Sequence, residues 1–169
     1  NVVINRQTNA AAGEGDAEAL APINLQQGGD EGAAIMGTRS DDLQVGGAGD
    51  DMMAAGKGDD IQVGGAGSDT MLGGQGDDQQ AGGSGDDVAY GGAGDDQQYG
   101  QSGNDSLSGG AGDDSQSGGS GDDAMRGGRG DDVQSGGEGA DQIRGGLGND
   151  TEYGGDGADS MRGGLGDDT

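Results

Sequence analysis

The stretch Gly82-Gly83-Ser84-Gly85-Asp86-Asp87-Val88-Ala89-Tyr90 decides the fold, because its pattern recurs along most of the chain. Asp87 is one of fifteen aspartates that follow one another every nine residues, from Asp42 to Asp168, without an omission. Two residues before each aspartate, glycine recurs in all fourteen copies from Gly49 to Gly166. A fixed short period indicates a repeat architecture in which each unit packs on its neighbours.

The composition excludes several classes of function. The 169 residues include 46 glycines, 33 acidic and 7 basic residues, which gives a net charge of −26, and only 27% are hydrophobic. This charge opposes binding to nucleic acid and anionic membranes. The chain has no histidine and no cysteine, which removes Ser-His-Asp and Cys-His catalysis and the usual zinc sites. No apolar run approaches the length of a membrane span. We therefore expect neither an enzyme nor a membrane-inserted protein.

Such a chain needs a counter-charge in order to fold. Low hydrophobicity with high net charge is typical of chains that are disordered in water. Glycines permit positive φ and tight turns, which can aim carbonyl oxygens inward, and the repeating aspartate adds a carboxylate. Hard oxygen ligands of this kind suit Ca²⁺, whereas Mg²⁺ requires a stricter octahedron and retains water. Calcium binding is therefore predicted to be the folding step.

The pattern G-G-x-G-x-D-x-U-x, in which U is usually apolar, resembles the RTX (repeats-in-toxin) calcium-binding family over residues 37–169. The three residues x-U-x suffice for a short strand, so two nonapeptide copies form one coil. The resemblance implies an all-β, right-handed parallel β-roll (a β-solenoid) with calcium ions between successive turns, each ion bridging copies i and i+2. Fourteen well-formed copies would then bind about a dozen calcium ions.

The predicted metal ligands are one aspartate and the first glycine of each copy. The aspartates are Asp51, Asp60, Asp69, Asp78, Asp87, Asp96, Asp105, Asp114, Asp123, Asp132, Asp141, Asp150, Asp159 and Asp168. The glycines are Gly46, Gly64, Gly73, Gly82, Gly91, Gly100, Gly109, Gly118, Gly127, Gly136, Gly145, Gly154 and Gly163. Ala55 and Gln101 each replace one glycine of a pair.

The repeat divides the chain into two parts. Residues 1–27 lack the pattern and are predicted to be a cap or an assembly arm, and residues 28–169 form the β-roll. Within the roll, residues 28–45 are degenerate copies, and residues 46–169 are the calcium-binding copies. The last copy stops before its U position, so either the chain was cut from a longer array or another copy of the chain completes this edge.

The U positions alternate strictly between polar and apolar, so the true repeat is a pair of nonapeptides. One sheet is predicted to present an apolar row, and the other a row of glutamines. Stacked amides about 4.8 Å apart can hydrogen-bond along such a row, which favours an internal ladder; a binding or assembly face would require the row to point outward. The row from residue 44 reads Gln44, Met53, Gln62, Met71, Gln80, Ala89, Gln98, Leu107, Gln116, Met125, Gln134, Ile143, Glu152 and Met161.

Residues that flank U are expected to point outward. Those of the early coils would form a sizeable apolar patch: Leu43, Val45, Met52, Ile61, Val63, Leu72, Val88, Tyr90 and Tyr99. Late coils instead carry Arg126, Arg144 and Arg162, which follow one another at intervals of two copies. This row is either a solvated face or the binding surface for an acidic partner.

Two functions remain open at this point. The first is a secreted structural protein that self-associates end to end, or through its outer apolar and arginine faces, into an extracellular filament or an adhesin or matrix stalk. The second is the calcium-binding module of a type I-secreted toxin, protease or lipase whose effector domain is missing. Both place the protein outside the cell, where calcium is abundant enough for weak extracellular sites.

Overall fold

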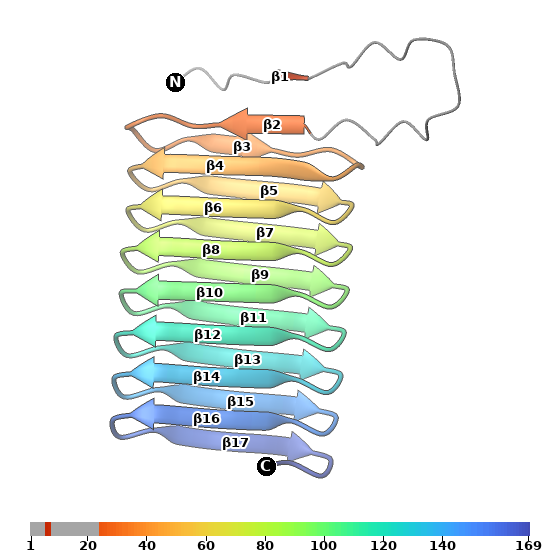
Figure 1. Cartoon of the computed structure of the whole chain (residues 1–169), viewed down its shortest axis with the longest axis vertical. Helices are drawn as coiled ribbons and strands as arrows, with labels where there is room; N and C mark the ends of the chain where they lie inside the picture. Colours follow the sequence, from red (N-terminus) through yellow and green to blue (C-terminus); the bar gives the residue numbers. More distant parts are fainter. Residues whose placement is uncertain (1–5, 8–23) are drawn as a thin grey trace, which may run out of the picture.

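The computed structural model describes residues 6–7 and 24–169. Figure 1 shows that these residues form a stack of strands joined by tight turns. The predicted all-β fold is confirmed: two sheets with parallel strands face each other, and the chain alternates between them. Among the described strands, one antiparallel pair occurs, which joins Arg6–Gln7 to Asn24–Gln27.

The even-numbered strands and β1 form one sheet, in the order β1-β2-β4-β6-β8-β10-β12-β14-β16. They are β1 (Arg6–Gln7), β2 (Asn24–Gln27), β4 (Asp42–Ala48), β6 (Ile61–Ala66), β8 (Gln79–Ser84), β10 (Gln97–Ser102), β12 (Ser115–Ser120), β14 (Val133–Glu138) and β16 (Thr151–Asp156). We call this the glutamine sheet, after its inward-facing row.

The odd-numbered strands form the second sheet, in the order β17-β15-β13-β11-β9-β7-β5-β3. They are β3 (Ala34–Met36), β5 (Met52–Lys57), β7 (Thr70–Gln75), β9 (Val88–Ala93), β11 (Ser106–Ala111), β13 (Ala124–Arg129), β15 (Gln142–Leu147) and β17 (Ser160–Leu165). We call this the apolar sheet.

The register of both sheets follows the two-copy period. Gln98 pairs with Gln116 in one sheet, and Leu107 pairs with Met125 in the other. Glycine permits this register at the turns, since the second and third glycines of each copy have positive φ, such as 122° at Gly83. Gln101 (φ 81°) is the only other residue with positive φ in the described part of the chain.

The core consists of two facing rows of side chains, one from each sheet. From the apolar sheet, Ile35, Met53, Met71, Ala89, Leu107, Met125 and Ile143 are each at most 3% exposed. The facing glutamines, from Gln26 to Gln134, are equally buried. The predicted internal ladder is therefore confirmed, and the alternative of an outward glutamine face is wrong.

The roll begins earlier than the sequence pattern suggested. β2 lies in residues assigned to the leader, yet it pairs in parallel with β4, and Gln26 is the first rung of the glutamine row. Gln26 pairs with Gln44 exactly one coil later, but no glycine pair precedes it. The rest of the predicted leader, apart from residues 6–7, lies outside the described residues.

The expected apolar patch is divided between two opposite faces. Leu43, Val45, Ile61 and Val63 lie on the outside of the glutamine sheet. Met52, Leu72, Val88 and Tyr90 lie on the outside of the apolar sheet. Because consecutive copies alternate between sheets, equivalent residues of consecutive copies lie on opposite sides of the roll, and each apolar surface is about half of the predicted one.

Candidate metal centre

The repeating aspartates lie in the turns at both edges of the roll. From Asp51 to Asp150 every predicted aspartate ligand is buried, with an exposed fraction of at most 2%. Asp159 is half-buried and Asp168 is exposed, because no further coil of the described chain covers them. The turns thus hold an inner row of carboxylates at each edge.

One oxygen of each inner carboxylate is used by the fold itself. Oδ1 accepts a hydrogen bond from a backbone N–H one coil earlier, as Asp105 does from Asp87 at 2.8 Å. The same bond recurs along both edges at 2.6 to 3.1 Å. Each inner aspartate therefore ties its coil to the preceding one.

The other oxygen has no partner. Oδ2 of every inner aspartate from Asp51 to Asp150 is buried without a hydrogen bond. An unpaired buried polar atom costs folding free energy, and the cost is larger for an ionised one. Because these orphaned oxygens recur at the same place in each copy from Asp51 to Asp150, they fit a positively charged ligand rather than a packing fault.

The first glycine of each copy lines the space around this oxygen. A Cβ at Gly64 would overlap Oδ2 of Asp69 and would also meet the carbonyl oxygen of Gly82 in the next coil. The same relation recurs in the other copies, so each predicted glycine lies beside its predicted aspartate. The structure thus brings together the two kinds of predicted ligand residue, with an oxygen-lined space between neighbouring coils.

Burial raises the pKa of the ten inner aspartates from Asp51 to Asp132 above the ordinary 3.8. Desolvation is the largest cause, and neighbouring carboxylates raise the pKa further, while the backbone N–H bond lowers it. The pKa reaches about 7 at Asp60, Asp78 and Asp114, and about 6 at Asp87 and Asp123. A bound cation would oppose both causes, because it offsets desolvation and screens the repulsion between carboxylates.

The degenerate copy at 37–42 engages the oxygen that is orphaned in later copies, although Oδ1 of Asp42 is buried without a partner. Oδ2 of Asp42 accepts hydrogen bonds from the backbone N–H of Thr38 at 2.5 Å and from its hydroxyl at 3.1 Å. Thr38 stands where other copies have the second glycine of the pair. Asp42 therefore keeps one unpaired oxygen, as the later inner aspartates do, but it is Oδ1 rather than Oδ2.

Sequence reasoning missed the role of the residue before each inner aspartate. Its side chain forms an outer ladder that runs in the opposite direction: Oδ1 of Asp95 accepts from the backbone N–H of Asp113, one coil later, at 2.8 Å. Asparagine does the same at Asn104 and Asn149. The signal was present in the sequence, because Asp or Asn fills most of these positions.

The donor set fits calcium. The described residues contain no group of three or more acidic, histidine or cysteine side chains that could hold a metal ion. Carboxylate oxygens instead occur singly, close to backbone carbonyls, and Ca²⁺ accepts such mixed oxygen ligands in flexible geometry. The inner aspartates and first glycines would hold the ion, and its positive charge would compensate the orphaned carboxylate oxygens.

Two stacked parallel sheets with oxygen-lined turns at both edges define a calcium-binding β-roll. The chain matches the RTX calcium-binding nonapeptide repeat (4 copies) in overlapping segments that cover residues 27–62, 45–80, 73–97, 81–116, 99–134, 117–152 and 135–169. The chain belongs to this family, whose repeats bind calcium and are structural modules typical of secreted proteins. Among the curated proteins, none matches the chain. Within the described residues, no helix has the length and apolar character needed to cross a membrane.

Proposed function

We propose that this chain is a secreted structural element that folds on about a dozen calcium ions and assembles end to end into an extracellular filament, or serves as an adhesin or matrix stalk. The inner aspartates and first glycines supply the calcium ligands. The surface by which one coil stacks on the next supplies the assembly contact.

The observation that carries the proposal is that every coil stacks on an equivalent coil through the same contacts. Strands pair one coil apart along each sheet. Each inner aspartate accepts a hydrogen bond from the coil before it, as Asp105 does from Asp87, and each outer one from the coil after it, as Asp95 does from Asp113. A coil of a second copy can stack in the same register, and contacts that do not close on themselves generate a filament.

Calcium makes this assembly conditional. Each coil buries one apolar side chain, which is far too little to offset the loss of conformational entropy when a whole coil is ordered. The orphaned carboxylates add repulsion in the absence of a cation. The chain is therefore unfolded at low calcium, as inside a cell, and forms its stacked coils where calcium is near millimolar.

The folding step is tested by far-UV circular dichroism with and without EGTA. We expect strand signal in millimolar calcium and its loss in the chelator. Strand signal that persists in EGTA would overturn calcium-dependent folding.

The assembly step is tested by negative-stain microscopy and light scattering at millimolar calcium. We expect polymers that lengthen with protein concentration and that disperse in EGTA. Met36→Lys, a change on an outer face, should leave the polymers intact. A calcium-saturated monomer at high concentration would exclude the filament.

The same stacking contacts favour one alternative, because coils within one longer array use them as well as coils of two copies can. The roll would then be the calcium-binding module of a type I-secreted toxin, protease or lipase. Under this alternative the calcium-loaded roll remains monomeric, and adding further coils after β17 raises its stability without producing polymers.

A further inference from the structure

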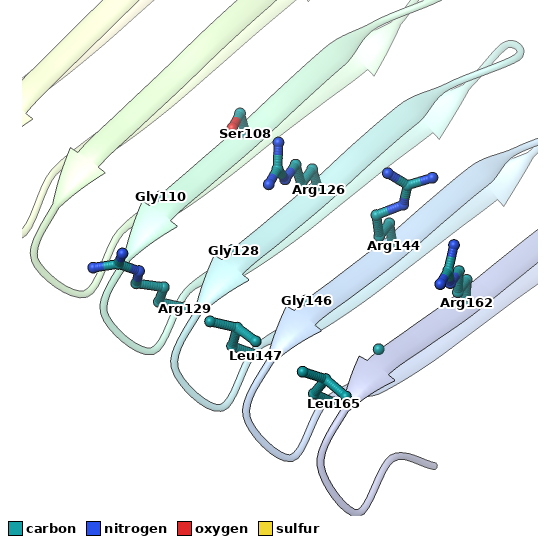
Figure 2. A pocket seen from close by; sticks show the side chains of 11 residues that line it. Ser108, Gly110, Arg126, Gly128, Arg129, Arg144, Gly146, Leu147, Arg162 and Leu165 are labelled. Carbon is teal, nitrogen blue, oxygen red and sulfur yellow. The ribbon is translucent and has the colours of Figure 1, made fainter.

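Positive charge gathers on one face of this acidic molecule. Residues 24–169 contain six Lys and Arg residues, and four of them line a groove of about 690 Å³ on the outside of the apolar sheet: Arg126, Arg129, Arg144 and Arg162. Figure 2 shows these side chains on consecutive strands, with Leu147 and Leu165 beside Arg129 along the turns. Arg129 was not part of the predicted row, because it ends β13 rather than flanking its U position.

These arginines have no partner within the described part of the chain. No ion pair or hydrogen bond engages their guanidinium groups, although the molecule carries a large excess of carboxylates. Arg126, Arg144 and Arg162 are also register neighbours in adjacent strands. Like charges at this spacing repel, so the row is unfavourable unless an anionic partner covers it.

The spacing of the row restricts that partner. Neighbouring parallel strands are about 4.8 Å apart, so a matching partner presents negative charges at that pitch. An extended peptide presents side chains of one face at about 6.7 Å, which is twice its rise per residue. Single-stranded nucleic acid is usually held on aromatic side chains, and the groove is lined by none.

The chain itself carries an acidic row of the required pitch. The turns that lead from the apolar sheet to the glutamine sheet hold six exposed outer aspartates, one per coil, which we call the acidic edge: Asp41, Asp59, Asp77, Asp95, Asp113 and Asp131. Their Oδ1 atoms accept backbone N–H groups, which fixes the side chains in place. The opposite edge is interrupted by Ser68, Asn104, Ala140 and Ala158.

We propose that the arginine groove binds the acidic edge of a second copy of this chain. Because both rows arise from the same coil spacing, each arginine of the row meets one aspartate when the two rolls lie side by side. The arginines occupy the last three coils, whereas the acidic edge extends over earlier ones, so the two copies are staggered. Exposed ion pairs are individually weak, and their in-register repetition supplies the specificity. This contact requires the calcium-loaded roll but is independent of end-to-end assembly.

The absence of cysteine from the chain allows a clean cross-linking test. One chain carries Ser108→Cys in the groove, and another carries Gln75→Cys beside the acidic edge. They are mixed in about 2 mM calcium with oxidised glutathione. The control replaces Ser108→Cys by Ser117→Cys, which lies on the outside of the glutamine sheet. We expect roughly five-fold more mixed disulfide from the groove pair than from the control pair.

Charge variants then test whether the arginine row and the acidic edge make this contact. Arg126→Gln, Arg144→Gln and Arg162→Gln together should remove the excess cross-linking, as should raising salt from about 20 mM to about 500 mM. The matched control, Ser84→Glu with Ser102→Glu and Ser120→Glu, makes the same change in net charge at the opposite edge of the roll and should leave cross-linking intact. Asp59→Asn, Asp77→Asn and Asp95→Asn should act like the arginine variant, since Asn104 and Asn149 already make the outer-ladder bond.

Two outcomes would overturn the proposal. One is equal cross-linking from the groove and control pairs, or cross-linking that survives the arginine variant. The other is arginine-dependent retention of the wild-type roll on dextran sulfate without cross-linking between chains, which would assign the groove to a foreign polyanion. The calcium midpoint by circular dichroism identifies variants that fail to fold. Because cross-linking is scored between pairs of rolls, the result is independent of whether filaments form.

Discussion

The first glycine of each copy lies directly against the carboxylate of the inner aspartate of that copy. At Gly91 an added Cβ would overlap Oδ2 of Asp96, so a side chain there displaces the carboxylate or fills the space between coils. Ala55 is the natural exception, because it carries a methyl group in this position of the copy that contains Asp60. The copy 55–60 therefore keeps its buried carboxylate but has an obstructed space beside it.

We predict that Ala55→Gly improves the calcium site of this copy. Removal of the methyl group frees the space beside Oδ2 of Asp60, so the variant should bind one more calcium ion, or bind that ion more tightly. Equilibrium dialysis and the calcium midpoint of folding measure both quantities. Ala81→Gly, on an outer face, is the control and should only destabilise, by roughly 0.5–1 kcal/mol. An unchanged stoichiometry and midpoint in Ala55→Gly would contradict the prediction.

The glutamine ladder links the coils of the glutamine sheet through buried hydrogen bonds. Each amide donates to the Oε1 of the glutamine one coil earlier, over distances of 2.6 to 3.2 Å. Some amides also donate across the core to a carbonyl of the facing sheet, as Gln80 does to Tyr90 at 3.0 Å. Buried amides thus join neighbouring coils and the two sheets at once, which a row of apolar side chains cannot do.

Gln98→Leu should therefore destabilise the roll. The change leaves Oε1 of Gln80, one amide hydrogen of Gln116 and the carbonyl of Ser108 without their partner, so we expect a loss of about 2–4 kcal/mol. Ser117→Ala, on the outer face of the adjacent strand, should change stability by less than about 0.5 kcal/mol. Calcium-induced folding monitored by circular dichroism compares the two variants. Equal midpoints would show that the ladder contributes no stability.

The ladder ends where a carboxylate replaces an amide. Oε1 of Gln134 is buried without a donor, because the next residue in the row is Glu152. Burial raises the pKa of Glu152, while its bond from the backbone N–H of Gly145 lowers it. This rung therefore combines an unsatisfied acceptor with a desolvated acid.

Glu152→Gln should stabilise the roll by about 1 kcal/mol. The new amide can donate to Gln134, its own Oε1 can still accept from Gly145, and the desolvated charge is removed. Glu138→Gln removes the same charge from an exposed site and is the control. The readout is the calcium midpoint or the melting temperature at fixed calcium, and a Glu152→Gln variant no more stable than the control would exclude an extended ladder.

At the scale of the whole molecule, negative charge decides when the roll can exist. The inner aspartates have an ordinary pKa of 3.8 in the unfolded chain, but burial raises it to about 7 at Asp78 and about 6 at Asp96. Between these values the metal-free roll binds more protons than the unfolded chain, so lowering the pH stabilises it and raising the pH destabilises it. Protons thus partly replace calcium.

The chain freed of calcium by dialysis should gain strand signal as the pH falls from about 7 to about 4. Far-UV circular dichroism at low protein concentration measures this change, with light scattering to detect aggregation. At saturating calcium the strand signal should depend little on pH near neutrality, and more calcium should be needed for folding as the pH falls. A metal-free strand signal that rises with pH would contradict the assignment of buried, unpaired carboxylates.

The nine-residue phase of glycine and aspartate predicted the fold, the register and the closeness of each first glycine to its aspartate, because each of these follows from local spacing. The inward direction of the glutamines was favoured but not decided, since polar side chains are buried only when partners are present. Two features became visible only in the three-dimensional structure: the division of the apolar patch between opposite faces, and the closeness of Arg129 to the arginine row. Both depend on which coil residues become neighbours across strands, which a linear pattern conveys only in part.

The two-copy coil also allows the molecule to change its length by folding and unfolding. A folded coil occupies about 4.8 Å along the stack, whereas the same stretch of chain spans about 60 Å when extended. Because each coil is held mainly by its two neighbours, coils can be released one at a time from an open end. Under tension and falling calcium, each released coil therefore lengthens the molecule by about 55 Å. When calcium is restored, the released coils refold and the molecule shortens again.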